Sequence, residues 1–249
     1  MVDHQFADLD LASLYDTECP WDERDDFGFY LPLVMAAGSV LDVGCGTGAL
    51  LHRARDDGHT GRLCGIDPAD GMLAQARKRS DIEWTLGDLT WVAWEQEFDL
   101  ILMSGHAFQV FLTDDELRIA LAAIRAALTD DGCFVFETRN PLVRGWERWV
   151  PANVADIGDT GIRRWHDVDL PVHGELVSFT TTYTAGGWDG PRHSRSTLRF
   201  LGQERLAQFL TDAGLVIQAQ YGDWDRQPVT DTSPEIITVA TRGPVSRTA

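Results

Sequence analysis

Three glycines at alternate positions could bind a small molecule. Gly44, Gly46 and Gly48 follow the aliphatic run 40–43, which is typical of a buried parallel strand. After the glycines, apolar residues return at helical spacing, at Leu50, Leu51 and Ala54. In a unit of strand, loop and helix, glycines let a ligand approach the backbone without Cβ atoms in the way, and the free N–H groups that begin the helix point at it. The sequence therefore predicts a small-molecule site on this loop.

An acidic residue at the end of the next expected strand bears on the kind of ligand. The strand 62–66 leads into Asp67, whose carboxylate can accept hydrogen bonds from both hydroxyls of a ribose. A dinucleotide site would need its third glycine three positions after the second, but Ala49 stands there and the third glycine is Gly48. The spacing therefore disfavours a dinucleotide.

Four segments, taken in order, closely resemble motifs of the class I S-adenosylmethionine-dependent methyltransferases. They are LDVGCGTG at 41–48, GIDPADGML at 65–73, Gly87-Asp88, and FDLILMSGHAF at 98–108. The resemblance covers roughly residues 38 to 140, and four motifs in order are more specific than a lone glycine pattern. It implies S-adenosyl-L-methionine as cofactor, S-adenosyl-L-homocysteine as product, and no metal. The cofactor-binding residues that it implies are Gly44, Cys45, Gly46, Gly48, Asp67, Pro68, Met72, Gly87, Asp88, Leu89, Ser104 and Gly105.

The acidic segment 1–30 precedes the first expected strand. In methyltransferases similar to this sequence, such a segment folds over the cofactor, and this makes Tyr15 and Trp21 cofactor-covering candidates. A surface helix held in place by two aromatic side chains is the alternative interpretation.

His106 is the ionisable side chain best placed to face both cofactor and acceptor. The expected strand 98–103 delivers it to the carboxyl edge of the sheet, where open parallel sheets bind ligands. If the acceptor is a hydroxyl, a neutral His106 can take its proton, and the rate should rise with pH through an apparent pKa near that of histidine. If the acceptor is an amine, it need only arrive unprotonated. A purely structural histidine is the alternative, and the fallback bases are Glu137, Tyr183 and His166.

The surrounding pattern alternates between strands and helices. Strands are expected at 40–43, 62–66, 82–86, 98–103, 132–137, 215–221 and 235–241, and helices after Gly48 and at 70–79, 113–128 and 204–213. The helix 113–128 opens with Thr113 and Glu116, a capping box. We therefore expect an α/β fold with a Rossmann-like, doubly wound, seven-stranded and mostly parallel sheet, whose last strand is antiparallel.

About sixty residues after Pro141 interrupt this alternation. The stretches 162–170, 175–184 and 192–201 are rich in Thr, Val and aromatic residues and are separated by turn sequences, which predicts a three-stranded antiparallel insertion. It looks like the substrate lid of small-molecule N- and O-methyltransferases, including those acting on amino sugars. Candidate pocket residues are Phe108, Arg139, Trp146, Trp165, His166 and Tyr183, although strand alternation sends about half of such lid residues to solvent.

These boundaries define four parts of the chain. We expect a cofactor-covering segment at 1–30, a methyltransferase core at 31–140 and 202–242, a lid at 141–201 and a flexible tail at 243–249.

The amino-acid composition limits the kinds of molecule that the chain is expected to bind. The 39 Asp and Glu residues outnumber the 21 Lys and Arg residues, and the net charge of -18 argues against a nucleic-acid binder, which needs a basic face. The four cysteines lack metal-ligand spacing and are interpreted as reduced thiols. No signal-peptide pattern or long apolar run is present. We therefore expect a cytoplasmic monomer or homodimer that acts on a small-molecule acceptor and binds neither nucleic acid nor membrane.

The predicted function is transfer of a methyl group from S-adenosylmethionine to oxygen or nitrogen of a small molecule by direct displacement. One alternative is a nucleotide-dependent oxidoreductase on the same type of sheet. The other is a non-catalytic protein that binds S-adenosylmethionine and lacks an acceptor pocket.

Overall fold

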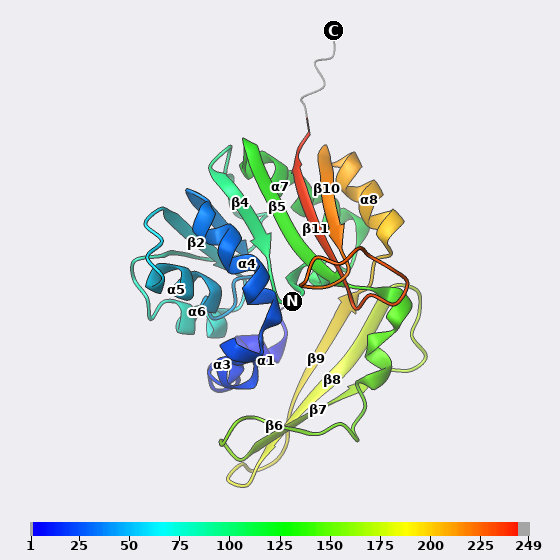
Figure 1. Cartoon of the computed structure of the whole chain (residues 1–249). Helices are drawn as coiled ribbons and strands as arrows, with labels where there is room; N and C mark the ends of the chain where they lie inside the picture. Colours follow the sequence, from blue (N-terminus) through cyan, green and yellow to red (C-terminus); the bar gives the residue numbers. More distant parts are fainter. Residues whose placement is uncertain (1, 244–249) are drawn as a thin grey trace.

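The computed structural model describes residues 2–243 as a large sheet with helices on both faces and a second, smaller sheet beside its lower edge (Figure 1). Residues 244–249, which form most of the tail expected at 243–249, lie outside the described residues. No helix within residues 2–243 is long and apolar enough to cross a membrane.

The large sheet has seven strands in the order β10-β11-β5-β4-β1-β2-β3. Their bounds are β1 Ser39–Val43, β2 Arg62–Asp67, β3 Glu83–Leu86, β4 Phe98–Met103, β5 Leu128–Arg139, β10 Leu215–Tyr221 and β11 Glu235–Arg242. Strand β11 is antiparallel to both of its neighbours, whereas the pairs from β5 through β4, β1 and β2 to β3 are parallel. This arrangement confirms the predicted α/β fold with an antiparallel last strand.

The helices cover both faces of the large sheet because its strands are apolar on both sides. Helices α4 (Asp25–Ala36), α5 (Ala49–Asp56) and α6 (Asp70–Ala76) lie on one face, and α7 (Asp114–Ala127) and α8 (Gln203–Asp212) lie on the other. In β1, Val40 joins the apolar cluster under α4 and α5, while Leu41 joins the cluster under α7 and α8. The predicted capping box of Thr113 and Glu116 begins α7.

The insertion folds as a separate antiparallel sheet in the order β6-β7-β8-β9. Its strands are β6 Ala155–Asp156, β7 Ile162–Val168, β8 Leu176–Ala185 and β9 Arg192–Arg199, and short 3-10 helices η3 (Pro141–Val143) and η4 (Gly145–Arg148) lead into it from β5. The prediction of three strands was wrong by one. Strand β6 has two residues, which is too short to show an alternating pattern in the sequence.

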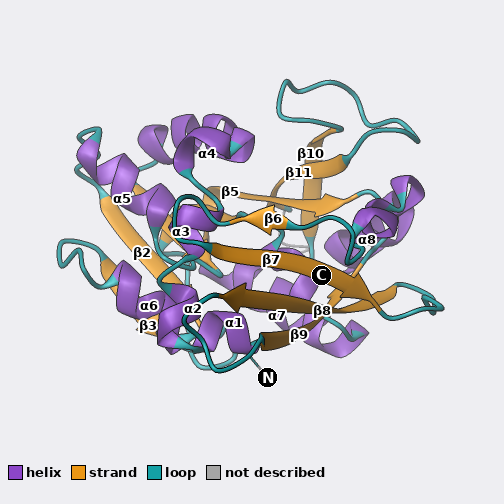
Figure 2. Cartoon of the chain, turned by 90° about the horizontal axis from the view of Figure 1, so that it is seen from below, coloured by secondary structure: helices purple, strands orange, loops and turns teal. Residues whose placement is uncertain are grey.

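The N-terminal segment folds as three single-turn helices, α1 (His4–Ala7), α2 (Leu9–Ala12) and α3 (Tyr15–Glu18), followed by the 3-10 helix η1 (Trp21–Glu23). In a view from below, α1 and α2 lie beside the small sheet and next to α6 (Figure 2). The predicted boundary at residue 30 falls inside α4, which belongs to the core. Residues 25–30 therefore pack as part of the core.

Candidate functional site

The glycine loop between β1 and α5 uses its three glycines for two different purposes. Gly44, Gly46 and Gly48 all have positive φ, at 74°, 56° and 76°. A Cβ atom on Gly44 would stand 2.8 Å from the Cβ of Ala107, and one on Gly48 would collide with the ring of Trp84. At Gly46 no heavy atom of residues 2–243 lies within 4 Å of that position. Two of the glycines thus permit close packing, and the middle one faces open space.

Asp67, at the end of β2, holds this loop in place. Its Oδ2 accepts a hydrogen bond from the Gly46 N–H at 2.8 Å, and its Oδ1 accepts one from the Ala69 N–H at 2.8 Å. Burial raises the pKa of the Asp67 carboxyl, and these two hydrogen bonds partly oppose the rise. Because each carboxylate oxygen can accept more than one hydrogen bond, the group can still accept from a ligand.

Asp42 is a second buried carboxylate beside the glycine loop, and the sequence reasoning missed it. It lies in β1 between apolar residues, and its Oδ1 has no hydrogen-bond partner within residues 2–243. Burial, together with the nearby Asp67, raises the pKa of Asp42 to about 8. The available signal was an acidic residue inside an otherwise aliphatic strand. Such a buried and unpaired carboxyl oxygen is suited to a cationic group of a ligand.

The N-terminal segment closes over this edge of the sheet. Asp16 accepts a hydrogen bond from the Thr47 hydroxyl of the glycine loop at 2.5 Å. The Tyr15 hydroxyl lies 3.9 Å from where a Cβ of Gly105 would stand, and burial raises the pKa of Tyr15 to about 12. Trp21, the other candidate, packs against Phe27 with ring centroids 4.5 Å apart. The structure thus brings Tyr15, but not Trp21, into contact with the predicted site.

The remaining predicted cofactor residues lie around the ends of β2, β3 and β4. Gly87 has a φ of 144°, and Asp88 is exposed and accepts a hydrogen bond from the Thr90 N–H at 2.8 Å. Cys45, Met72 and Leu89 are buried in apolar clusters, and Met72 packs against Tyr15. Pro68 and Gly105 are exposed and Ser104 is half-buried. Most of these positions can therefore offer a ligand their backbone groups rather than their side chains.

His106 follows β4 and has a positive φ of 64°, a conformation that is uncommon for a residue other than glycine. Its backbone N–H donates to Oε1 of Glu137 at 2.5 Å, and the other oxygen of Glu137 accepts from the Tyr30 hydroxyl. The His106 side chain turns toward β11, where its Nε2 lies 3.0 Å from Oε2 and 3.1 Å from Oε1 of Glu235. Glu137 thus fixes the backbone, which leaves the imidazole to pair with Glu235.

The pKa values of this pair differ from the ordinary ones in opposite directions. Burial and the nearby Arg139 lower the pKa of His106 to about 3, and burial raises the pKa of Glu235 to about 8. The lowered pKa of His106 argues against the expected rise in rate through an ordinary histidine pKa, which stays a prediction for a pH–rate profile to test. Glu235 was also missed, since it is 129 residues from His106 in the sequence.

One face of the small sheet, formed by β7 and β8, carries two of the candidate residues, Tyr183 and His166. Tyr183 lies opposite Arg164 in the pairing of β7 with β8, and His166 lies opposite Thr181, so these side chains share a face. The Tyr183 hydroxyl donates to Gln5 at 3.1 Å, and burial strongly raises its pKa. Burial, Arg164 and then Arg139 lower the pKa of His166 to about 4. The His166 ring lies 6.1 Å from that of Trp149, which Arg139 of β5 overlies, and the hydrogen bond to Gln5 joins Tyr183 to the N-terminal segment.

Three of the predicted pocket residues do not line this face. Phe108 is buried and stacks on Phe136 with ring centroids 4.1 Å apart, and Trp146 is buried against Phe200 at 4.6 Å. Trp165 alternates with His166 along β7 and therefore points to the opposite face of the small sheet. Of the other candidates, Arg139 remains at the edge, where its side chain donates to Gln109 at 2.9 Å and lies over Trp149.

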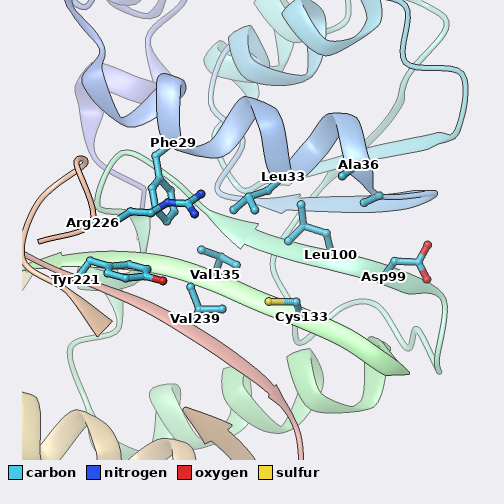
Figure 3. Close-up of a pocket in the computed structure, with 11 residues that line it drawn as sticks. Phe29, Leu33, Ala36, Asp99, Leu100, Cys133, Val135, Tyr221, Arg226 and Val239 are labelled. Carbon is cyan, nitrogen blue, oxygen red and sulfur yellow. The ribbon is translucent and has the colours of Figure 1, made fainter. Parts of the chain in front are cut away.

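An open groove lies elsewhere, between α4 and the strands β4, β5, β10 and β11 (Figure 3). It has a volume of about 410 Å³ and is mainly apolar, with Phe29, Leu33 and Val135 among its walls. None of the residues that the sequence predicts for cofactor or acceptor lines it. The groove is therefore separate from the candidate site.

Comparisons with known proteins agree with this geometry. A methyltransferase domain family matches residues 40–132, which include the glycine loop, Asp67 and His106. The cypemycin N-terminal methyltransferase of Streptomyces sp. is 26% identical over 216 residues, which cover 82% of this chain and 83% of that protein.

Two solved structures share the fold over nearly the whole chain. The CcbJ methyltransferase from Streptomyces caelestis has a TM-score of 0.78 at 20% identity and covers 96% of this chain and 98% of its own. CalS10 from Micromonospora echinaspora, an amino pentose methyltransferase solved with S-adenosylmethionine bound, has a TM-score of 0.68 at 24% identity and covers 92% and 95%. Residues 40–132 therefore match a methyltransferase domain, and the chain as a whole has the fold of S-adenosylmethionine-dependent methyltransferases, as the predicted motifs imply.

Proposed function

We propose that this protein moves the methyl group of S-adenosylmethionine to an oxygen or nitrogen atom of a small molecule by direct displacement. One observation carries the proposal: the open position at Gly46 and the His106–Glu235 pair lie at the ends of neighbouring strands, at one edge of the sheet. A cofactor on the glycine loop and an acceptor beside His106 would then meet at the topological switch point between β1 and β4.

The residues at the glycine loop fit this cofactor. S-adenosylmethionine supplies a methyl group that is reactive because its sulfur is positively charged. The free space at Gly46 admits a ligand to the backbone, and Asp67 keeps acceptor capacity for ribose hydroxyls. The unpaired Oδ1 of Asp42 can accept a hydrogen bond from the ammonium group of the methionine portion. Tyr15 and the Asp16–Thr47 contact would exclude water from this half of the site.

The acceptor half supports a small polar molecule. His106, Glu137, Arg139 and Glu235 are ionisable residues that lie together and largely buried at this edge of the sheet. Such groups can orient an acceptor and take up its proton, while the lid keeps water away. The names of two similar proteins, an N-terminal methyltransferase and an amino pentose methyltransferase, favour nitrogen. We propose a cytoplasmic enzyme that acts as a monomer or homodimer and uses no metal.

Two measurements test the proposed function. Saturating S-adenosylhomocysteine should raise the melting temperature and NAD should not, because a ligand that binds only the folded state stabilises it. Methyl-labelled S-adenosylmethionine should then label at least one member of a panel of small amines and matching alcohols. Stabilisation by NAD alone would favour the oxidoreductase. Tight binding of S-adenosylhomocysteine with no labelled product across the panel would favour the non-catalytic binding protein.

A further inference from the structure

We propose that Glu235 and His106 together accept the proton of the methyl acceptor and select an amine over a hydroxyl. The inference rests on the proposed methyl transfer and assigns a role to Glu235, the first residue of β11.

The first argument concerns the position of Glu235. The pairing of β11 with β5 sets Glu235 opposite Arg139, at the same edge of the sheet as the residues that follow β4. The Glu235 side chain is 13% exposed and that of His106 is 20% exposed, so both are largely enclosed but not sealed. Both carboxylate oxygens lie within hydrogen-bond distance of His106 Nε2. An acceptor beside His106 would therefore meet Glu235 as well.

The second argument compares Glu235 with the other carboxylates at this edge. Glu137 is held by the Tyr30 hydroxyl and the His106 N–H, and Asp26 is held by two hydrogen bonds from Arg24, at 2.7 and 2.5 Å. Within residues 2–243, Glu235 has His106 as its sole side-chain hydrogen-bond partner. Glu137 is also fully buried, whereas the Glu235 side chain keeps 13% exposure, so Glu235 is the one of these three carboxylates that a ligand beside His106 can best reach.

The charges that face the pair come from β5 and from the start of α4. Arg139 and Glu137 lie on β5, Asp26 lies at the start of α4, and Arg24 directly precedes it. Arg139 favours the neutral form of His106 and the charged form of Glu235, while Asp26 acts in the opposite sense on both. These effects come after burial, which is the main cause of both pKa shifts.

The pKa values of about 3 for His106 and about 8 for Glu235 set the number of protons that the pair holds. Between about pH 3 and about pH 8, His106 and Glu235 hold one titratable proton between them, whichever atom carries it. A second proton would bind only weakly in that range. Above about pH 8 the pair is empty and carries one negative charge, so that it attracts a cation and can accept its proton.

An amine can give its proton to the His106–Glu235 pair more readily than a hydroxyl can. An acceptor that arrives as an ammonium group breaks one N–H bond and leaves the proton on Glu235 or on Nε2 of His106. The freed electron pair forms the bond to the methyl carbon, the C–S bond breaks, and its electrons remain on sulfur. A hydroxyl loses its proton only near the pKa of about 15.7 that bulk water shows, far above the range of this pair. An ammonium group loses its proton within a few units of the range of the pair, as the ordinary pKa of about 10.4 for lysine shows.

The experiment follows His106 directly, in full-length protein that is saturated with S-adenosylhomocysteine and labelled with ¹⁵N-histidine. In wild type, the ¹⁵N chemical shifts of the His106 ring should change with an apparent pKa of about 8, because they report the loss of the proton that the pair shares. In Glu235→Gln they should not change between about pH 5 and pH 9, because burial and Arg139 keep the imidazole neutral. Glu204→Gln, a change at an exposed glutamate in α8, serves as the matched control and should behave as wild type.

Two simple probes test the selectivity for an amine. Methylammonium should lower the apparent pKa of about 8 in wild type, because a cation favours the charged pair, and it should have no effect on Glu235→Gln. Methanol at the same concentration should leave both proteins unchanged. A His106 titration that is the same with and without Glu235, or equal responses to methylammonium and methanol, would overturn the proposal. Failure of S-adenosylhomocysteine to stabilise wild type would instead contradict the proposed function.

Discussion

The glycine loop and the His106–Glu235 pair lie at the same edge of the sheet but are built in different ways. The loop offers mainly backbone, and its shape is set by positive φ angles and by the Asp67 carboxylate at the end of the neighbouring strand β2. The pair offers side chains from two strands' ends that come together only when β11 inserts beside β5. The first region depends on local conformation, and the second depends on the register of the whole sheet.

Because of this difference, the two regions should tolerate different substitutions. A backbone site loses its ligand when a side chain fills the space, and replacement of a distant residue should matter little to it. A side-chain site can lose its chemistry through one substitution that leaves the fold and the cofactor half intact. The two regions should therefore respond independently to mutation, and the predictions below test this separation.

The largest effect is expected from Gly46→Val. A branched side chain would fill the open space at the loop, at a φ of 56° that is unfavourable for valine. Binding of S-adenosylhomocysteine should become undetectable by calorimetry, while the far-ultraviolet circular dichroism spectrum stays native. Retained binding would show that the loop does not touch the ligand, and the cofactor half would then have to lie elsewhere.

Glu235→Gln should give the clearest separation of the two halves. Methyl transfer to an amine should fall by roughly 10²–10⁴-fold, the usual contribution of a positioned acid or base. Affinity for S-adenosylhomocysteine should stay within twofold of wild type, because Glu235 makes its side-chain contact with His106 and not with the glycine loop. The rate of wild type should rise with pH through about 8, and this rise should be smaller in the mutant when the same acceptor is used. Equal losses of binding and of rate would show that the two halves are one unit.

The contrast between the regions also explains what the sequence could predict. The sheet, its antiparallel last strand and the capping box at Thr113 are visible because each depends on short-range patterns of apolar residues, glycines and caps. The glycine loop and Asp67 are visible for the same reason. His106 could be placed at the edge because it directly follows an evident strand.

The partners of His106 could not be predicted, because they depend on register and on neighbouring elements. Glu235 begins β11 after a polar loop, and nothing local shows that it lies opposite Arg139. Phe108 is two residues from His106, yet it is buried against Phe136, since the chain turns into the 3-10 helix η2 (Ala107–Val110). Trp165 looked like a pocket residue by type, but its place in the alternation of β7 sends it to the far face.

Asp67→Ala tests the cofactor half through a side chain rather than through the backbone. Loss of a hydrogen bond to a charged acceptor costs about 1.5–3 kcal/mol, which corresponds to roughly 10- to 150-fold weaker binding of S-adenosylmethionine. Part of the loss is indirect, because Asp67 also holds the N–H groups of Gly46 and Ala69. Calorimetry should show this loss, and the His106 titration should be unchanged. An unaltered affinity would count decisively against the ribose assignment.

The last prediction concerns the pH dependence of stability, and it comes from Asp42. The pKa of this carboxyl is about 8 in the folded protein and near 3.8 when it is exposed to water, so the folded state holds the proton more tightly. Between these values unfolding releases a proton, and the free energy of unfolding should fall as the pH rises from about 4 to 8. Glu235, whose pKa is also raised to about 8, contributes in the same direction.

Asp42→Asn should therefore flatten this dependence without abolishing it. Chemical denaturation of wild type at pH 5.5 and at pH 8 should show the greater stability at the lower pH, with a smaller difference in Asp42→Asn. Asp189→Asn, at an exposed turn of the lid, is the matched control and should retain the wild-type difference. If Asp42 meets the ammonium group of the cofactor, S-adenosylhomocysteine should lower the pKa of Asp42 and release a proton on binding near pH 7, and Asp42→Asn should abolish that release. Calorimetry in buffers with different ionisation enthalpies measures this proton. A release that persists in Asp42→Asn would place the ammonium group against another carboxylate and would weaken the separation between the two halves of the site.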